Sequence, residues 1–160
     1  MTLDPEQLRR SMRAWSSGVT IVTAMHDGDR HGMTVSSFTS VSLEPPLVII
    51  SLHTGSRTHR LVSGSSAFAV NILGADQRQL SERFAGRGGW DEDRFEGVET
   101  ETLLTGAPTL PASLARLDCR VQQVIPVGMN TLFLGEVVAA RGDGEGQPLV
   151  YHNRQYREFV

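Results

Sequence analysis

The chain has 160 residues and a mass of 17.5 kDa, which is the size of one ordinary domain and too small for two. Apolar residues make up 39% and charged residues 21%, so we expect a folded globular protein rather than a disordered one. The net charge of -3 gives no electrostatic reason to expect nucleic acid or an anionic membrane as a partner. One cysteine excludes an internal disulfide, and with a polar N-terminus that lacks a signal-peptide core it predicts a reduced, cytoplasmic compartment.

The first predicted element is a helix that begins after Asp4, with Pro5 in its first turn and Gln7 completing a capping box. An apolar face follows at helical spacing: Leu8, Met12 and Trp15. The chain then changes to short runs that predict strands at 19–25, 32–38, 40–43, 47–52, 67–73, 115–122, 131–140 and 149–151. Short helices are predicted at 56–62 and 76–84, and the glycine-rich, acidic stretch 86–97 is predicted to be a mobile surface loop.

One predicted strand is apolar on both faces of its pleat, because residues 47–50 read Leu-Val-Ile-Ile. Such a strand suits a closed β-barrel with helices or a second subunit packed outside it. Residues 115–122 instead alternate apolar and polar, which is typical of a half-buried strand and places Cys119 in the core. The sequence therefore predicts a single domain over residues 1–160, mainly β, with two or three short helices.

The usual catalytic motifs are missing from the sequence, which has no G-x-S-x-G elbow, no P-loop and no G-x-G-x-x-G after a strand. The five histidines never take the helical spacing of a metal pair, so no metal site is predicted. Small hydroxyl residues are instead concentrated at 34–42. This run is either a polar strand edge or a wall of hydrogen-bond donors against a flat ring such as a flavin, with apolar packing on the ring's face.

A second polar cluster surrounds the predicted start of the helix at 56–62. It consists of hydroxyl residues and one arginine: Ser51, Thr54, Ser56, Arg57 and Thr58. Helix N-terminal amides, hydroxyls and a guanidinium together form a phosphate site, although Ser56 alone is better explained as a helix cap. Taken together, the two clusters favour a flavin mononucleotide moiety.

Most of the chain resembles the short-chain flavin reductases, the reductase components of two-component flavin-dependent monooxygenases. The resemblance is carried by GVTIVT at 18–23, GMTVSSFTSVS at 32–42, EPPLV at 44–48, FAVN at 68–71, RFA at 83–85, GAP at 106–108 and LFLGEV at 132–137. It implies an FMN-binding split β-barrel of Greek-key type, a homodimer, and hydride transfer from NADH or NADPH to FMN or FAD. It also implies a separate flavin-dependent oxygenase that receives the reduced flavin.

The resemblance further implies which residues hold the flavin. Those against the ring are Met33, Thr34, Val35, Ser36 and Ser37. Those around the phosphate are Ser51, Ser56, Arg57 and Thr58. Those beside the cofactor are Arg83, Phe84 and Ala85. No residue is assigned a catalytic role, since the ring carries the electrons.

The nicotinamide side departs from the family pattern. Asn130 stands where many members have a histidine associated with the nicotinamide, and an asparagine cannot carry its positive charge. We therefore expect the C-terminal residues His152, Arg154 and Tyr156 to orient NADH or NADPH without touching the tightly bound part of the flavin. The alternative for these residues is a solvated tail.

Two other functions stay open at this point. One is a non-catalytic flavin- or haem-binding split barrel, and the other is a small-ligand-binding barrel without a cofactor. A flavin spectrum of the purified protein would argue against a barrel without a cofactor. Oxidation of NADH or NADPH would argue against a non-catalytic binding protein.

Overall fold

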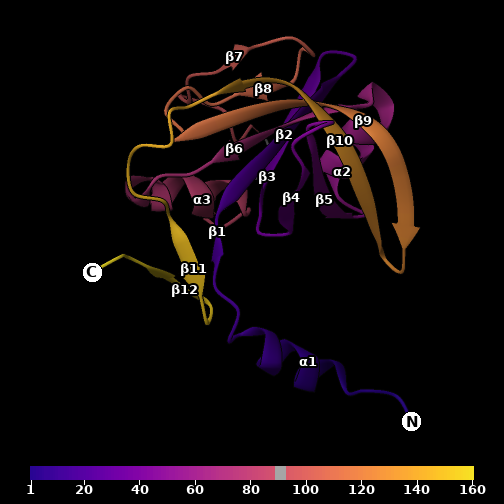
Figure 1. The fold of residues 1–160 in the computed structure, drawn as a ribbon, viewed down its shortest axis with the longest axis vertical. Helices are drawn as coiled ribbons and strands as arrows, with labels where there is room; N and C mark the ends of the chain where they lie inside the picture. The colour runs from indigo at the N-terminus through magenta and orange to yellow at the C-terminus, as the bar shows by residue number, and fades with distance from the viewer. Residues whose placement is uncertain (89–92) are drawn as a thin grey trace.

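The computed structural model describes residues 1–88 and 93–160, and the chain is mainly β (Figure 1). The body is a seven-stranded antiparallel sheet in the order β3-β2-β6-β9-β10-β5-β4, in which strands distant in the chain pair with one another. Its strands are β2 (Thr20–His26), β3 (Asp29–Val35), β4 (Phe38–Ser42), β5 (Leu47–His53), β6 (Ala67–Ile72), β9 (Ala115–Val127) and β10 (Asn130–Arg141). In a smaller sheet β11 (Val150–His152) pairs with β1 (Ser17–Gly18) on one side and with β12 (Gln155–Arg157) on the other. A further small sheet pairs β7 (Glu101–Thr102) with β8 (Pro108–Thr109).

Three α-helices accompany the strands: α1 (Pro5–Met12), α2 (Arg57–Ser65) and α3 (Arg78–Phe84), the last preceded by the 3-10 turn η1 (Ala75–Gln77). The N-termini of α1 and α2 are capped by the predicted residues, because Asp4 accepts from the N–H of Glu6 at 3.0 Å and Ser56 accepts from the N–H of His59 at 3.2 Å. The helices α2 and α3 both pack on the β2–β3 hairpin. In contrast, α1 extends away from the body and buries none of its residues (Figure 1).

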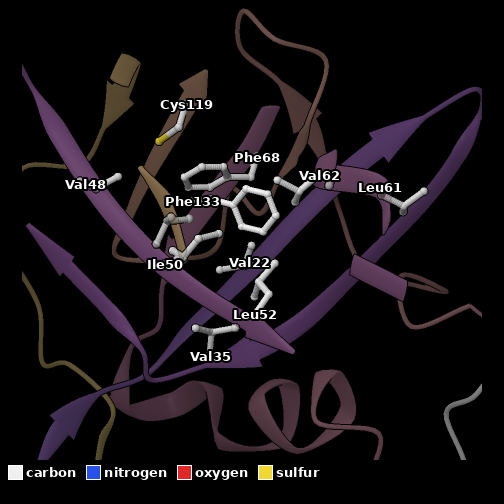
Figure 2. Close-up of a cluster of buried hydrophobic side chains, with 12 residues drawn as sticks. Val22, Val35, Val48, Ile50, Leu52, Leu61, Val62, Phe68, Cys119 and Phe133 are labelled. Carbon is white, nitrogen blue, oxygen red and sulfur yellow. The ribbon is translucent and has the colours of Figure 1, made fainter. Parts of the chain in front are cut away.

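The main core fills the inside of the curved sheet. Figure 2 shows Phe68 and Phe133 at its centre, surrounded by aliphatic side chains such as Val22, Ile50 and Leu52. Cys119 lies in the same cluster and is fully buried, so its predicted place in the core is confirmed. Burial raises the pKa of its thiol to about 12.

A second core lies between β2, α3 and the C-terminal sheet, and part of it comes from the predicted surface loop. Phe95 is only 2% exposed, and its ring meets the edge of Phe84 with centroids 5.0 Å apart. Arg94 donates to the carbonyl of Phe84 at 2.7 Å. The prediction of a mobile surface loop at 86–97 is therefore wrong for the part after residue 92, and residues 89–92 lie outside the described part of the chain.

The strand β5 has apolar side chains on both faces, as predicted. Val48, Ile50 and Leu52 are buried in the core, whereas Leu47 and Ile49 point outward and are half-buried. Residues directly opposite one another in paired strands lie on the same face of a sheet. The outward-facing side of β5 therefore extends across β10 to β9. We define the outer apolar face by its half-buried members: Leu47, Ile49, Leu132, Leu134 and Ile125.

Gly135 in β10 leaves the room that Phe68 occupies. An added Cβ would lie 2.6 Å from Cζ and 2.8 Å from Cε1 of the Phe68 ring. Gly135→Val should therefore overpack the core and lower the free energy of unfolding by about 1–3 kcal/mol, as measured by urea denaturation. Gly18→Val is the matched control, because a Cβ there meets nothing within 4 Å. Equal stability of the two variants would contradict this account of the core.

Candidate cofactor-binding site

Side chains of residues 33–36, at the end of β3, point alternately to the two sides of the strand. Met33 and Val35 pack against the main core, so they can offer a ligand only their backbone. Thr34 points to the other side, where its hydroxyl donates to the carbonyl of Ser81 in α3 at 2.5 Å. Ser36 follows on the exposed surface.

A hollow of about 150 Å³ lies where β3, α3 and the C-terminal hairpin meet, and we call it the ring hollow. Its lining combines hydroxyls, aromatic rings and one arginine: Val19, Thr34, Ser36, Ser81, Ala85, Arg87, Tyr151 and Tyr156. The hydroxyls of Tyr156 and Ser81 are 2.8 Å apart, and the rings of Tyr151 and Tyr156 meet edge to face at 5.3 Å. Such a lining suits one face of a flat, polar ring system.

The ring hollow opens toward a larger hollow of about 430 Å³ beside α1. Ser36 and Tyr151 line both, so they form the junction. Arg154 lines the larger hollow together with Met12, the last residue of α1, and Trp15, which follows the helix. A molecule larger than a single ring system therefore has room to extend from the ring hollow.

Of the predicted residues 83–85, only Ala85 lines the ring hollow. Phe84 is fully buried in the second core, so its side chain cannot touch a ligand in this arrangement. The guanidinium of Arg83 donates to the carbonyl of Glu96 at 2.8 Å. The burial of Phe84 contradicts a direct contact of its side chain with a cofactor, whereas the role predicted for Arg83 stays a prediction.

The start of α2 forms a second, more polar hollow of about 510 Å³, which we call the phosphate hollow. Its lining residues come from the β5–α2 connection and from α2: Thr54, Gly55, Ser56, Arg57, His59, Arg60 and Ser63. The first turn of a helix directs backbone N–H groups at such a space, and the helix dipole favours an anion there. The phosphate cluster predicted from the sequence thus includes Ser56 and Arg57 in one concave surface.

The hydroxyl of Thr58 is turned away from the phosphate hollow. Thr58 is fully buried, and its Oγ1 lies 2.8 Å from Nδ1 of the buried His31. The prediction that its side chain holds a phosphate is therefore wrong, and only its backbone N–H faces the first turn. His59 instead lines the hollow, with its Nε2 2.9 Å from the hydroxyl of Thr131, and burial lowers its pKa.

Arg57 does not act alone, because it forms an ion pair with Asp29 at the start of β3. Nη2 of Arg57 donates to one carboxylate oxygen, and Nε approaches the other at 3.4 Å. This hydrogen bond, followed by the charges of Arg57 and Arg60, lowers the pKa of Asp29. The sequence analysis missed Asp29, for which the available signal was only an acidic residue after a hairpin turn.

Ser37 and Ser51 line neither hollow and are hydrogen-bonded to each other. The hydroxyl of Ser37 donates to the carbonyl of Ser51 at 2.7 Å, and the N–H of Ser51 donates back to the carbonyl of Ser37 at 3.2 Å. Ser37 follows Ser36 of the ring hollow, and β5 leads from Ser51 to the phosphate hollow. This pair of bonds joins the residue after Ser36 to β5, the strand that precedes the phosphate hollow.

The residues predicted to orient the nicotinamide do not form one cluster. Asn130 begins β10 opposite His53, next to the phosphate hollow, where the N–H of Thr54 donates to the carbonyl of Met129 at 3.0 Å. His152 lines a separate hollow of about 300 Å³ that also contains Arg157.

Tyr156 lines the ring hollow, so a flavin ring placed there would meet its side chain. His152 and Tyr156 lie on different sides of the β11–β12 hairpin, whose strands alternate their side chains. Arg154, in the turn between the strands, lines the hollow beside α1. The C-terminal hairpin thus presents three different surfaces.

The buried His31 should make stability depend on pH. Burial, followed by the positive charges of Arg94 and Arg57, lowers its pKa from 6.5 to about 4. Between those values the unfolded chain binds a proton that the folded chain does not, so stability should fall by about 1–3 kcal/mol as the pH drops from 6.5 to 4.

His31→Gln should remove that contribution while keeping a donor for Thr58, and it should flatten the profile of unfolding free energy in this pH window. His26→Gln is the control, since the side chain of His26 is 39% exposed. A steep profile that persists in His31→Gln would assign the pH dependence to other groups.

Among residues 1–88 and 93–160, there is no group of three or more His, Cys, Asp or Glu side chains that could hold a metal ion. None of the described helices combines the length and apolar character that a membrane crossing requires.

A hollow lined by hydroxyls and aromatic rings, together with an arginine-bearing helix N-terminus, suits a phosphorylated ring compound. The chain matches the family model described as flavin reductase like domain over residues 12–159. The chain therefore belongs to this family, and the predicted FMN-binding split β-barrel is confirmed.

Individual relatives agree with this assignment. The chain is 39% identical over 158 residues to the reductase component of 4-nitrophenol 4-monooxygenase/4-nitrocatechol 2-monooxygenase from Rhodococcus opacus, covering 99% of this chain and 83% of the relative. It is also 39% identical over 155 residues to the NADH:riboflavin 5'-phosphate oxidoreductase of Streptomyces pristinaespiralis, covering 95% and 86%. The solved NADH:FAD oxidoreductase SgcE6 of Streptomyces globisporus, in complex with NAD and FAD fragments, has a TM-score of 0.89 and 33% identity, covering 100% of this chain and 97% of that one.

Proposed function

We propose that the protein is an NAD(P)H:flavin oxidoreductase that transfers a hydride to FMN or FAD and supplies the reduced flavin to a separate oxygenase. The observation that carries the proposal is the presence of two polar hollows in a chain of the flavin reductase family. One hollow offers hydroxyls and aromatic rings, and the other offers a helix N-terminus with two arginines. Relatives named as NADH-dependent reductases, and as reductase components of monooxygenases, support the same reaction.

The residues of the two hollows fit the chemistry of a flavin nucleotide. When bound, the flavin ring supplies the electron-carrying chemistry. Thr34 and Ser36 offer small hydroxyls that let the ring approach the backbone, and Tyr156 offers an aromatic surface. Ser56 and Arg57, with the first-turn amides of α2, bind the phosphate. The work of the protein is to place the nicotinamide C4 within roughly 3–3.5 Å of the flavin and to exclude water.

We further propose that the protein is a homodimer of single-domain subunits in the cytoplasm. The outer apolar face supports a dimer, because its half-buried leucines and isoleucines lie on the side of β5, β10 and β9 that faces away from the main core. Light scattering should therefore give about twice the 17.5 kDa mass of the chain. Leu134→Arg, at the middle of this face, should shift the protein to a monomer, and a wild-type mass of 17.5 kDa would contradict the proposal.

The activity is tested by steady-state oxidation of NADH and NADPH with FMN, FAD and riboflavin in turn. Oxidation that depends on added flavin supports the proposal, and the ratios of kcat/KM identify the preferred pair. A protein that binds flavin but oxidises neither nicotinamide would be a flavin carrier. A protein that shows no flavin spectrum after addition of FMN or FAD would be a binding protein for another ligand.

A further inference from the structure

Two arginines of the phosphate hollow share one carboxylate. Arg57 and Arg60 lie one turn apart on α2, and both line the hollow. Asp29 reaches them from the start of β3, accepting from Nη2 of Arg57 on Oδ1 and from Nη2 of Arg60 on Oδ2, the latter at 3.4 Å. The carboxylate therefore comes from a different element than the residues that line the hollow.

The carboxylate of Asp29 cancels part of the positive charge that the two arginines offer to a phosphate. Among the described residues, two guanidinium groups and one carboxylate leave one net positive charge to meet a phosphate monoester, which carries roughly 1.5–2 negative charges at neutral pH. The side chains of Arg57 and Asp29 are each 37% exposed, so solvent only partly screens their interaction. Asp29 also occupies two donors of the Arg57 fork, the same planar group that recognises a phosphate.

We propose that Asp29 is a competing anion that weakens the binding of the flavin phosphate, so that the flavin is held as an exchangeable substrate and not as a permanent prosthetic group. This inference rests on the proposed function, which places the phosphate at the start of α2. Reduced flavin must leave the site to reach an oxygenase. Asp29 makes that departure easier, because it gives Arg57 and Arg60 an anionic partner whenever the phosphate leaves.

The test compares ligands with and without a phosphate. Asp29→Asn should tighten the binding of FMN and FAD about three- to tenfold, because the repulsion and the competition for Arg57 both disappear. The affinity for riboflavin, which has no phosphate, should stay unchanged. Both are measured by fluorescence titration. The gain for FMN should shrink at high salt, and stopped-flow measurement should show slower FMN dissociation.

A matched control lies on the same hairpin. Asp27→Asn removes the same charge two residues away, at a side chain that is 89% exposed and contacts only the ring of His26 in the described part of the chain. It should change FMN affinity by less than about twofold, since a charge in open solvent is screened. The double variant Asp29→Asn/Arg57→Ala should lose most of the gain, because Arg57 is the group that the carboxylate occupies.

Weaker or unchanged FMN binding in Asp29→Asn would overturn the inference, because the carboxylate would then orient Arg57 for the phosphate or have no influence on it. A separate result identifies failure at the level of the proposed function. If Arg57→Ala weakens FMN binding and Asp29→Asn does not strengthen it, only the inference falls. If the wild-type protein binds FMN no tighter than riboflavin and Arg57→Ala changes neither, the phosphate site falls and the inference with it.

Discussion

Asp118→Ala should lower the free energy of unfolding by about 3–5 kcal/mol, the largest stability change that we expect from a single substitution. Asp118 in β9 is fully buried, and its carboxylate accepts the backbone N–H groups of Leu104 at 2.7 Å and Thr105 at 2.8 Å. It also accepts the hydroxyl of Thr105. Its removal leaves these donors without an acceptor and frees the connection between β7 and β8. Urea denaturation measures the loss.

Two variants separate the hydrogen bonds of Asp118 from a general sensitivity to mutation. Asp118→Asn keeps the side-chain shape and one acceptor oxygen, so it should lose clearly less stability than the alanine variant. Asp143→Ala removes an exposed carboxylate that accepts only the nearby N–H of Glu145 at 2.9 Å among the contacts of the described residues. Its stability should stay within about 0.5 kcal/mol of the wild type. Equal losses in all three variants would contradict the role of Asp118.

Ser36→Leu should lower flavin affinity by more than about tenfold, which is the largest effect on binding that we expect. Ser36 is exposed at the junction between the ring hollow and the hollow beside α1, so a larger apolar side chain occupies space at this junction. The barrel should stay folded, because no core contact is lost. Fluorescence titration with FMN and FAD measures the effect, and circular dichroism checks the fold.

Ser40→Leu makes the same chemical change at an exposed serine of β4 and serves as the control. We expect it to bind flavin within about twofold of the wild type. Normal flavin uptake by Ser36→Leu would place the ring elsewhere, and the hydroxyl-rich run at 34–42 would then be an ordinary strand edge.

The strands were largely predictable because their local patterns agree with their final environment. Residues 47–52 were predicted as a strand from composition alone, and β5 covers Leu47–His53. The strand predicted at 115–122 is correct at its start but continues to Val127. The reason is a register shift between Leu134 and Gly135 of β10. At this shift the alternation of apolar and polar side chains along β9 is broken, but the backbone pairing of the two strands continues.

The site was predictable as a set of backbone segments and less so as a set of side chains. Family motifs indicate where the chain passes, but neighbouring residues of a strand point in opposite directions, as Thr34 and Val35 do. Thr58 and Phe84 were assigned to the ligand for the same reason, although each is fully buried. Asp29 could not be found from local sequence, because its partner Arg57 lies 28 residues away and reaches it only through the packing of α2 on the hairpin.

The burial of Cys119 bears on how readily hydrogen peroxide, a by-product of flavin reduction in air, oxidises the protein. Free reduced flavin reacts with dioxygen and generates hydrogen peroxide, which oxidises cysteine through its thiolate form. Cys119 is the single cysteine of the chain, and the centre of the barrel both covers it and keeps its pKa near 12. We therefore expect peroxide to oxidise this thiol slowly, because the buried sulfur is hard to reach and little of it is in the thiolate form.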